Sequence, residues 1–483
     1  MSMNAPTVQS EGSPKKVEKT IHSWQYVVAA CGVLGFILIA WLAPASAGLT
    51  QAGKTTLGIL FLMLTWWISE ITSVLVTGFL GMVLMLLFNV TDMPTIFSGF
   101  SSNVFIFMIF AFAIAVAVQK TGLGKRLAYS LIARSKPSFR SIMVSLVLVG
   151  FVLGAIIPLA NACTVVLGTI GMMILPVFGQ SEDKKSNVGR SIFTMLGFTT
   201  YITSQVYLAG LSAILVSGLL AKAGLTMNYL QWFVAFAPQA LVVCILLALI
   251  IPMIFPPEVK VVSVEKYKEF QATLHGLGPM TTQEKKAAIV VGVTLVLWMI
   301  GSFIKLSLIT AGVLGGVLLM FPGIGVLNGD DFSKKIPWEA VFFTGFCLTL
   351  GSVLPATGIT KFLANLAHPV LGSSSLLVFC LKVWVLANLV HLILPAPQAA
   401  AATFVPVLIA SAQAQHFSIL IPVVVFLASY TAAIMVYQQT QTVIAFGFKQ
   451  FNSQDLLKPG FVTAALWLLM TPLTVLYLTA IGH

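Results

Sequence analysis

The chain has little charge. Of its 483 residues, 8% are Asp, Glu, Lys or Arg and 58% are apolar, whereas a typical soluble domain carries about 25% charged residues. So few charges cannot cover the surface of a soluble chain of this length, which excludes an ordinary soluble protein. The net charge is +12, but the basic residues are spread thinly between apolar stretches, which argues against a nucleic-acid-binding surface.

The sequence also lacks the residue patterns of disulfide frameworks, metal sites and catalytic centres. Its five cysteines are an odd number without paired spacing, so we expect them to be small buried hydrophobic residues: Cys31, Cys163, Cys244, Cys347 and Cys380. No His/Asp/Glu cluster, Ser/His pair or phosphate-binding loop lies in the apolar stretches, so we expect no enzyme activity. The predicted spans contain no acidic residue, although a channel or a cation/proton antiporter would need buried acids.

Long apolar runs are abundant. A bilayer core of about 30 Å needs roughly 20 residues of helix, and eleven runs approach that length: 24–43, 55–68, 74–90, 104–118, 191–220, 232–254, 287–303, 308–321, 340–354, 419–445 and 461–480. Two further stretches, 142–176 and 374–412, are too long for one span. Pro158 interrupts the first, and Pro395 and Pro397 interrupt the second.

The basic residues predict an orientation. If both interrupted stretches enter and leave the membrane on the same side, 21 of the 26 Lys and Arg residues lie on the side of the N-terminus, which is then cytoplasmic. The five on the other side are Lys54, Lys222, Lys305, Lys361 and Lys382. We therefore interpret the two stretches as re-entrant hairpins. Non-helical backbone at membrane depth is tolerated only where protein or a cavity surrounds it, so the hairpin tips should line a site.

The sequence resembles itself at an offset of 236 residues. Thr121 to Ala128 aligns with Thr357 to Ala364, and Tyr201, Ser204 and Gln205 align with Tyr437, Thr440 and Gln441. Each half has an odd number of crossings, so the halves should be inverted relative to each other, as in secondary transporters. Apolar helices can resemble one another by composition alone, but these matches include Lys, Thr, Tyr and Gln in one register.

We therefore predict an all-α polytopic membrane protein with about eleven transmembrane helices and two re-entrant hairpins in an inverted repeat. The expected parts are a disordered cytoplasmic tail (1–22), an extra helix (23–46), a first repeat (55–255) with a hairpin at about 140–180, a cytoplasmic linker (256–285), and a second repeat (286–483) with a hairpin at about 374–414. The polar start shows no cleavable signal or transit peptide, so we expect a multi-pass protein of a bacterial inner membrane.

Several motifs in this order resemble a known family. They are Thr65 to Glu70 (TWWISE), Lys120 to Leu123 (KTGL), and Tyr229 to Phe233 (YLQWF) followed by Pro256 to Glu258. From about Leu57 to its end, the chain resembles the divalent anion:sodium symporters. Ile202 to Ser204 and His391 resemble the branch of bacterial citrate and tartrate exchangers and plastid oxoglutarate/malate translocators. The resemblance implies a homodimer that carries di- or tricarboxylates by elevator-like alternating access.

The hairpin tips depart from the family pattern. The family has Ser-Asn-Thr at each tip, where side chains and carbonyls hold sodium and substrate carboxylates. Here the first tip reads Ala160-Asn161-Ala162, with Thr164 downstream, and the second reads Ala396-Pro397-Gln398. The loss of side-chain oxygens weakens the case for sodium. We therefore expect no cofactor and sodium-independent anion exchange, with proton- or sodium-coupled symport as the alternative.

The candidate ligands of the anion are the few polar residues in the apolar interior. No Arg lies in this region, so backbone N–H groups at helix starts should carry much of the anion binding. The predicted substrate-binding residues are Asn161, Thr164, Thr203, Ser204, Gln205, His391, Gln398, Gln439, Thr440, Gln441 and Thr442. The alternative is that these groups only bond neighbouring helices.

Three ionisable residues in or beside the spans have two interpretations each. His391 could supply a positive charge or a proton, or it could be satisfied by a neighbouring carbonyl. Lys382 could act in the site, or its ammonium could reach the outer surface. Glu70 follows a predicted span, and we expect it to cap or pair at the cytoplasmic interface rather than to bind substrate.

Overall fold

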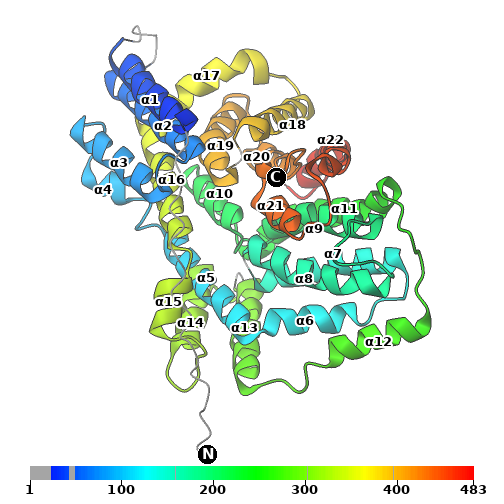
Figure 1. Cartoon of the computed structure of the whole chain (residues 1–483). Coiled ribbons are helices and arrows are strands. Elements are labelled where there is room, and N and C mark those ends of the chain that lie inside the picture. The colour runs from blue at the N-terminus through cyan, green and yellow to red at the C-terminus, as the bar shows by residue number, and fades with distance from the viewer. Residues whose placement is uncertain (1–22, 43–48, 158, 302, 395, 483) are drawn as a thin grey trace, which may run out of the picture.

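A computed structural model describes residues 23–42, 49–157, 159–301, 303–394 and 396–482 (Figure 1). The predicted tail at 1–22 lies outside the described residues, as do Pro158 and Pro395 at the predicted hairpin tips. The side chain of His275 is also not described.

The described residues form helices joined by short connections. In the first half these are α1 (Ser23–Ile37), η1 (Leu38–Leu42), α2 (Gln51–Ser69), α3 (Val74–Leu87), α4 (Met93–Phe97), α5 (Asn103–Thr121), α6 (Leu123–Ile132), α7 (Phe139–Ile156), α8 (Ala160–Val177), α9 (Asn187–Val206), α10 (Leu211–Lys222), α11 (Tyr229–Ile254) and α12 (Val264–His275). In the second half they are α13 (Thr282–Ile300), α14 (Leu308–Met320), α15 (Gly329–Lys335), α16 (Trp338–Ala356), α17 (Ile359–Leu371), α18 (Leu376–Ile393), α19 (Pro397–Ala414), α20 (Leu420–Ser429), η2 (Val436–Gln438), α21 (Thr440–Gly447), η3 (Ser453–Leu456) and α22 (Leu457–Ala480).

The prediction of an all-α membrane protein is confirmed. Each of the eleven predicted spans contains helix, and nine helical segments of the described chain are long and apolar enough to cross a bilayer. Three of these nine, α7, α8 and α18, are arms of the two helix pairs that occupy the predicted hairpin ranges. The described residues contain no β-strand, only one isolated bridge between Ser138 and Val261.

The order of elements repeats along the chain. A long helix (α5), a short helix (α6), a helix pair (α7 and α8), an interrupted helix (α9 and α10) and a long helix (α11) are followed by the series α16, α17, α18 and α19, α20 and α21, and α22. The relative orientation of the two halves stays a prediction.

The interruptions of the two broken helices do not follow the 236-residue offset. The first covers 207–210 and the second covers 430–439, so Tyr201 lies in the helix α9 whereas its sequence partner Tyr437 lies in the interruption. Gln438 explains the longer second interruption, because its Oε1 accepts hydrogen bonds from the backbone N–H groups of Ile434 and Met435, both at 2.7 Å. The side chain thus replaces helical partners that the backbone lacks there.

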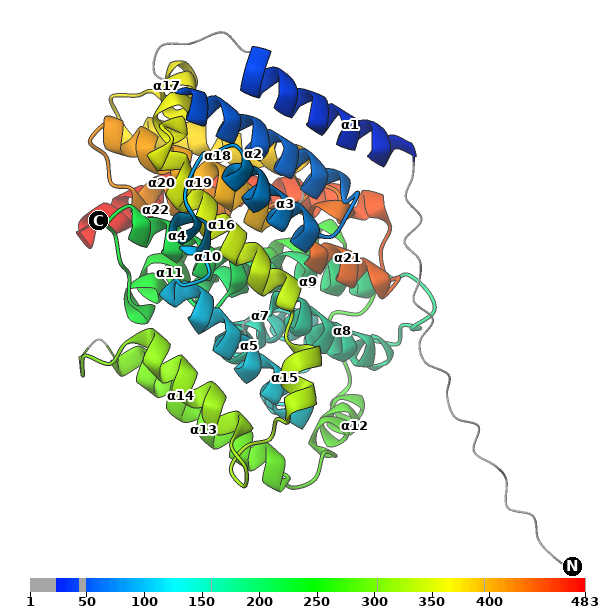
Figure 2. The same cartoon turned by 90° about the vertical axis from the view of Figure 1, so that its left-hand side faces the viewer.

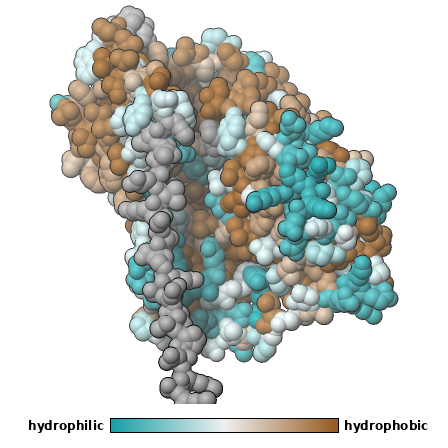
Figure 3. Space-filling model, viewed as in Figure 1, coloured by the Kyte–Doolittle hydropathy of each residue, from teal (hydrophilic) through white to brown (hydrophobic). Residues whose placement is uncertain are grey.

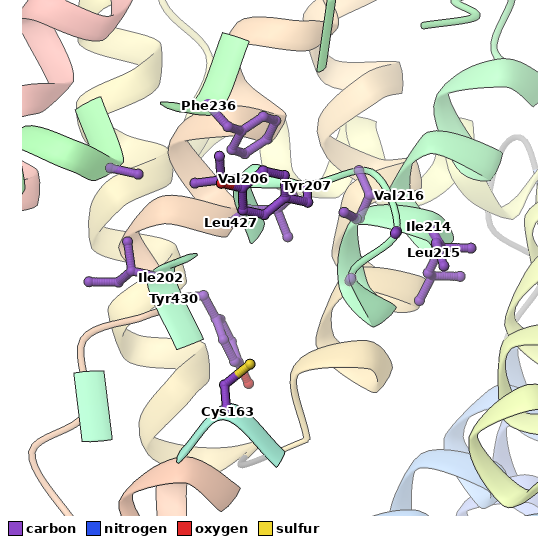
Figure 4. Close-up of a cluster of buried hydrophobic side chains, with 14 of the residues drawn as sticks. Cys163, Ile202, Val206, Tyr207, Ile214, Leu215, Val216, Phe236, Leu427 and Tyr430 are labelled. Carbon is purple, nitrogen blue, oxygen red and sulfur yellow. The ribbon is translucent and has the colours of Figure 1, made fainter. Parts of the chain in front are cut away.

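Helix α9 lies in the centre of the molecule, packed against α7, α8, α11 and α21. Nearly all of its residues are buried. Figure 4 shows Ile202 and Val206 of α9 close to Leu427 of α20 and Tyr430, the residue that follows α20. This apolar packing fixes the end of α9, where the first interruption begins.

Basic residues that were predicted to be cytoplasmic meet acidic partners at one end of the helices. Lys120 of α5 and Lys335 of α15 bind the buried carboxylate of Asp331 at 2.6 and 2.7 Å, and Arg126 of α6 binds Glu284 at 2.8 Å. We call this the inner end. Helix α16 runs from here to α17, which lies at the opposite end together with Lys361 (Figure 2). We call that the outer end.

The surface reflects the membrane environment. Figure 3 shows hydrophilic residues gathered toward the side of α12, whereas the region of α1 to α4 is mostly hydrophobic.

Four of the five cysteines are buried as predicted, but Cys31 is exposed. The prediction was wrong there because α1 packs one face against α2 and leaves other residues, such as Val27 and Leu34, exposed.

The Asp331 cluster should contribute to stability in a pH-dependent way. Burial disfavours the ionised carboxylate, but hydrogen bonds from Lys120, Lys335 and the Asn328 N–H outweigh it and hold the pKa of Asp331 below its usual value. The contribution is therefore complete above the unfolded-state pKa of about 3.9 and is lost as the pH falls through the folded-state pKa.

We expect Asp331→Asn to lower the free energy of unfolding by about 1–3 kcal/mol at pH 7. The difference in unfolding free energy between the variant and the wild-type protein should narrow below about pH 4.

The matched control is Asp330→Asn. Asp330 pairs with Lys334 at 3.2 Å, but both side chains are exposed (75% and 73%), so its removal should cost less than about 0.5 kcal/mol. Unfolding of the purified protein in detergent at several pH values measures both. Equal losses in the two variants would contradict this account of the cluster.

Candidate functional site

Four helices begin around one small cavity of about 140 Å³. They are α8 and α19, the second arms of the two helix pairs, and α10 and α21, the helices that follow the two interruptions. The cavity is lined by Leu159, Ala160, Asn161, Tyr201, Ser204, Leu211, Ser212, Pro397, Gln398, Thr440 and Gln441. The two tips and the two interrupted helices, far apart in sequence, therefore meet at one place.

None of these four helix starts is capped by a side chain. The first turn of a helix has N–H groups without intrahelical partners and carries a partial positive charge of about half a unit. Helix α19 offers fewer donors because it begins at Pro397, which lacks an N–H. The cavity therefore has a positive potential and free donors, although no Lys or Arg lines it.

The start of α10 is set by a close backbone approach. A Cβ on Gly210 would lie 2.1 Å from the carbonyl oxygen of Ser204, so only glycine fits between α9 and α10. The N–H of Gly210 donates to the Tyr207 carbonyl at 2.8 Å and closes the turn. The indole N–H of Trp232 donates to the Gln205 carbonyl at 2.9 Å, so the end of α9 is also held.

The polar side chains of the cavity connect these elements. Gln441 of α21 donates from Nε2 to Oδ1 of Asn161 at the first tip, at 2.8 Å. Gln398 at the second tip donates from Nε2 to the hydroxyl of Ser212 in α10, at 3.4 Å. Each tip is thus linked to one interrupted helix by neutral groups that can also bind an anion.

Five of the predicted binding residues line this cavity: Asn161, Ser204, Gln398, Thr440 and Gln441. The prediction omitted Tyr201 and Ser212. Ser212 lies in the first turn of α10, two residues after Gly210. The Ala-Gly pair before it was the available signal, because a glycine at that point of an apolar run marks a helix break.

The other predicted binding residues lie behind the cavity wall. The hydroxyl of Thr164 pairs with that of Thr200 at 2.7 Å, and Thr203 donates to the Thr200 carbonyl at 3.1 Å. Thr442 donates to two carbonyls of the second interruption, and Gln439 donates to another, that of Thr431, at 2.6 Å. The buried Gln205 does not line the cavity either. These groups join elements of the site, and direct binding by them stays a prediction.

His391 is fully buried between the second helix pair and the second interruption. Its Nδ1 lies 2.9 Å from the carbonyl oxygen of Ala432, and its Nε2 lies 3.1 Å from that of Gln438. The ring stacks on Tyr430 at a centroid distance of 4.1 Å. Lys382 donates to the Gly372 carbonyl at 2.6 Å. Neither residue lines the cavity, and both have carbonyl partners.

A larger cavity of about 630 Å³ lies between the small cavity and the inner end. It shares Leu211 and Gln398 with the small cavity and extends to Glu70, after α2, and Glu339, in the first turn of α16. Leu211 and Gln398 therefore form the wall between the small cavity and a vestibule that faces the inner end. Glu70 lies at the mouth of this vestibule, where it forms the C-cap of α2 with a left-handed φ of 48°.

The potential of the site can be tested with charged thiol reagents. In a Cys31→Ser background, the labelling rate with an anionic methanethiosulfonate is divided by the rate with a cationic one, for Asn161→Cys in the cavity and for Thr72→Cys in the vestibule. This ratio should be about tenfold higher for Asn161→Cys than for Thr72→Cys. Thr72 lines the same vestibule as Glu70 and Glu339, which should favour the cationic reagent. Labelling rates followed by mass spectrometry give the two ratios. Similar ratios at the two positions would contradict a positive electrostatic potential in the cavity.

Comparison with known proteins agrees with this architecture. A membrane protein of Cupriavidus necator is 27% identical over 91% of this chain and 89% of its own length. The L-tartrate/succinate antiporter of Escherichia coli (strain K12) is 24% identical over 86% of this chain and 82% of its own. The fold is similar to that of the YdaH transporter of Alcanivorax borkumensis, with a TM-score of 0.52, 13% identity and coverage of 95% and 97% of the two chains.

The family model described as the sodium:sulfate symporter transmembrane region matches residues 22–481. This confirms the resemblance to the divalent anion:sodium symporters, and the antiporter match agrees with the predicted branch. The chain belongs to this symporter family.

Proposed function

We propose that this protein is a secondary transporter that carries small organic anions, di- or tricarboxylates, by elevator-like alternating access through the cavity at the four helix starts. The observation that carries the proposal is the convergence of α8, α10, α19 and α21, all without side-chain caps, on a cavity without a fixed full charge. Uncapped helix starts bind carboxylate and phosphate oxygens in many proteins.

The neutral side chains give this site its selectivity in the proposed scheme. Asn161, Gln398 and Gln441 can each turn an amide N–H₂ toward a carboxylate oxygen, and Thr440 can donate a hydroxyl. The Ser204 hydroxyl donates to the Tyr201 carbonyl at 2.7 Å and binds the anion only after it leaves that partner. The cavity of about 140 Å³ is several times larger than the ~10–15 Å³ that a single water molecule needs. That volume suits a small anion, and the shared vestibule leaves room for a longer one.

The proposed mode is sodium-independent exchange. The relative of Escherichia coli is an L-tartrate/succinate antiporter, which supports exchange of dicarboxylates. Ala160, Ala162, Ala396 and Pro397 stand where side-chain oxygens would be needed for sodium. We further propose that the protein acts without a cofactor, as a homodimer in a bacterial inner membrane.

Exchange through this cavity has a direct test. Proteoliposomes loaded with unlabelled succinate should take up labelled succinate, and Gln398→Leu should reduce the initial rate at least tenfold, because it removes an amide that lines both the cavity and the vestibule. The matched control is Thr403→Val in the same helix, whose hydroxyl only donates to the Ala399 carbonyl at 2.8 Å. It should retain most of the rate.

Uptake measured with and without an internal anion, and with and without a sodium gradient, distinguishes exchange from sodium-coupled symport. Uptake should require an internal anion and should be unchanged when external sodium is replaced by choline. A strict sodium requirement would overturn the exchange proposal, and no uptake of any di- or tricarboxylate under any gradient would overturn the transport proposal.

Proton-coupled symport is the second candidate, because both ring nitrogens of His391 face carbonyl oxygens. A neutral imidazole donates through only one nitrogen, whereas an imidazolium donates through both. If His391 takes up the coupled proton, His391→Gln should flatten the pH dependence of uptake between pH 5 and 8 and should abolish acidification of the vesicle interior. An unchanged pH profile in His391→Gln would exclude this role.

A further inference from the structure

A second polar pocket lies at the outer end, away from the substrate cavity. It has a volume of about 340 Å³ and is formed by α10, α16, α17 and α19. Its polar lining residues are Lys222, Thr360, Lys361 and Gln413. We call it the outer pocket.

The outer pocket is distinct from the substrate cavity, with which it shares no lining residue. Helices α10 and α19 begin at the substrate cavity and reach the outer pocket near their C-terminal ends. From Leu211 to Lys222 the chain advances eleven residues of α10, which is about 16 Å at about 1.5 Å per residue. An anion in one cavity therefore does not touch the other.

The outer pocket is strongly positive. No acidic residue lines it, and none of the ion pairs found among the described residues includes Lys222 or Lys361. The ammonium of Lys222 donates to the Leu348 carbonyl and the Ser352 hydroxyl, which are neutral. Helix α17 begins at this pocket, after Gly358, and no side chain caps it. Lys222 and Lys361 both line this space and the start of α17 borders it, while the Lys222 ammonium is held by two neutral groups of α16 beside it.

A buried hydroxyl without a partner gives independent support. Thr360 lines the outer pocket and is only 8% exposed, and its buried Oγ1 has no hydrogen-bond partner. Buried hydroxyls in proteins nearly always have a partner. Rotation of the Thr360 side chain to its other helical rotamer would let an oxyanion in the pocket accept this hydrogen bond.

The outer pocket is not a by-product of the internal repeat. At the 236-residue offset, Lys361 aligns with Lys125 but Thr360 aligns with Gly124. A Cβ on Gly124 would lie 2.8 Å from Cδ1 of Ile157, so an apolar side chain fills the corresponding space in the first half. The unpartnered hydroxyl has no counterpart at Gly124.

We propose that the outer pocket is an anion-binding site for a small oxyanion group, a carboxylate or a phosphate, held by Lys222, Lys361, the Thr360 hydroxyl and the first N–H groups of α17. The group can come from a soluble anion on the outer side or from the headgroup of an anionic lipid. The site bridges α10 and α19, which carry the substrate cavity, to α16 and α17. The proposal does not depend on which anion is transported.

Protection of a single thiol tests the outer pocket. Gln413 is an exposed lining residue, and Cys31 is the exposed cysteine of the described chain, so Cys31→Ser with Gln413→Cys places one accessible thiol in the pocket. In detergent free of phospholipid, sulfate, inorganic phosphate and succinate should each slow labelling by a maleimide at least threefold and saturably, relative to chloride at equal ionic strength. In nanodiscs, phosphatidylglycerol in place of phosphatidylcholine distinguishes the lipid source.

Matched variants make the result specific. Lys361→Gln and Thr360→Val should each weaken the protection, and Lys361→Arg should retain it. Gln398→Leu, in the substrate cavity, should leave it unchanged, so failure of the proposed transport function does not affect this test. The proposal would be overturned if neither the three anions nor phosphatidylglycerol slowed the labelling. Protection that persists in the Lys361→Gln/Thr360→Val double variant would also overturn it, and unchanged melting without anion shows that the variants are folded.

Discussion

The structure depends on one electrostatic constraint: an anion at membrane depth must be stabilised where water is scarce. A basic side chain could do this, but it would have to be buried without its own counterion whenever the site is empty, which is costly. The protein has instead brought together four helix starts, whose N–H groups supply partial charges that the helices themselves support. The scarcity of charge in the sequence and the chemistry of the site are therefore two aspects of one solution.

The remaining architecture holds these helix starts in place. A helix can begin at mid-membrane only if the preceding backbone is satisfied by other groups. Gly210 permits a four-residue turn before α10, whereas the longer interruption before α21 relies on the Gln438 side chain and on the contact of His391 with two carbonyls. Several polar residues near the site thus bind the protein backbone, whereas Asn161, Gln398, Gln441 and Ser212 line the cavity and bind one another across it.

The sequence was sufficient to predict the helical class and to name five of the polar residues that line the cavity. That helix starts bind the anion in place of Arg stays a prediction. Helical periodicity and charge bias depend on local composition, which is readable without a structure. It was not sufficient to separate Gln398, which lines the cavity, from Gln439, which lies behind it. The direction of a side chain in a non-helical segment is set by tertiary contacts, and the second interruption has none of the glycine signals that mark the first. Cys31 was assigned wrongly for a related reason, since an apolar residue in lipid has no need to be buried in protein.

The absence of a fixed full charge at the cavity has a consequence for membrane energetics. In the proposed transporter the empty site crosses as a neutral object, whereas the loaded site carries the whole charge of its passenger. A dianion moving alone against 100 mV would require about 4.6 kcal/mol, from about 2.3 kcal/mol for each elementary charge. When one dianion returns for each that leaves, the two electrical terms cancel. Exchange of anions of equal valence therefore moves no net charge, and exchange of anions of different valence is driven by voltage. What a site without lysine or arginine adds is that its empty crossing carries no charge, so the membrane potential acts only on the loaded steps.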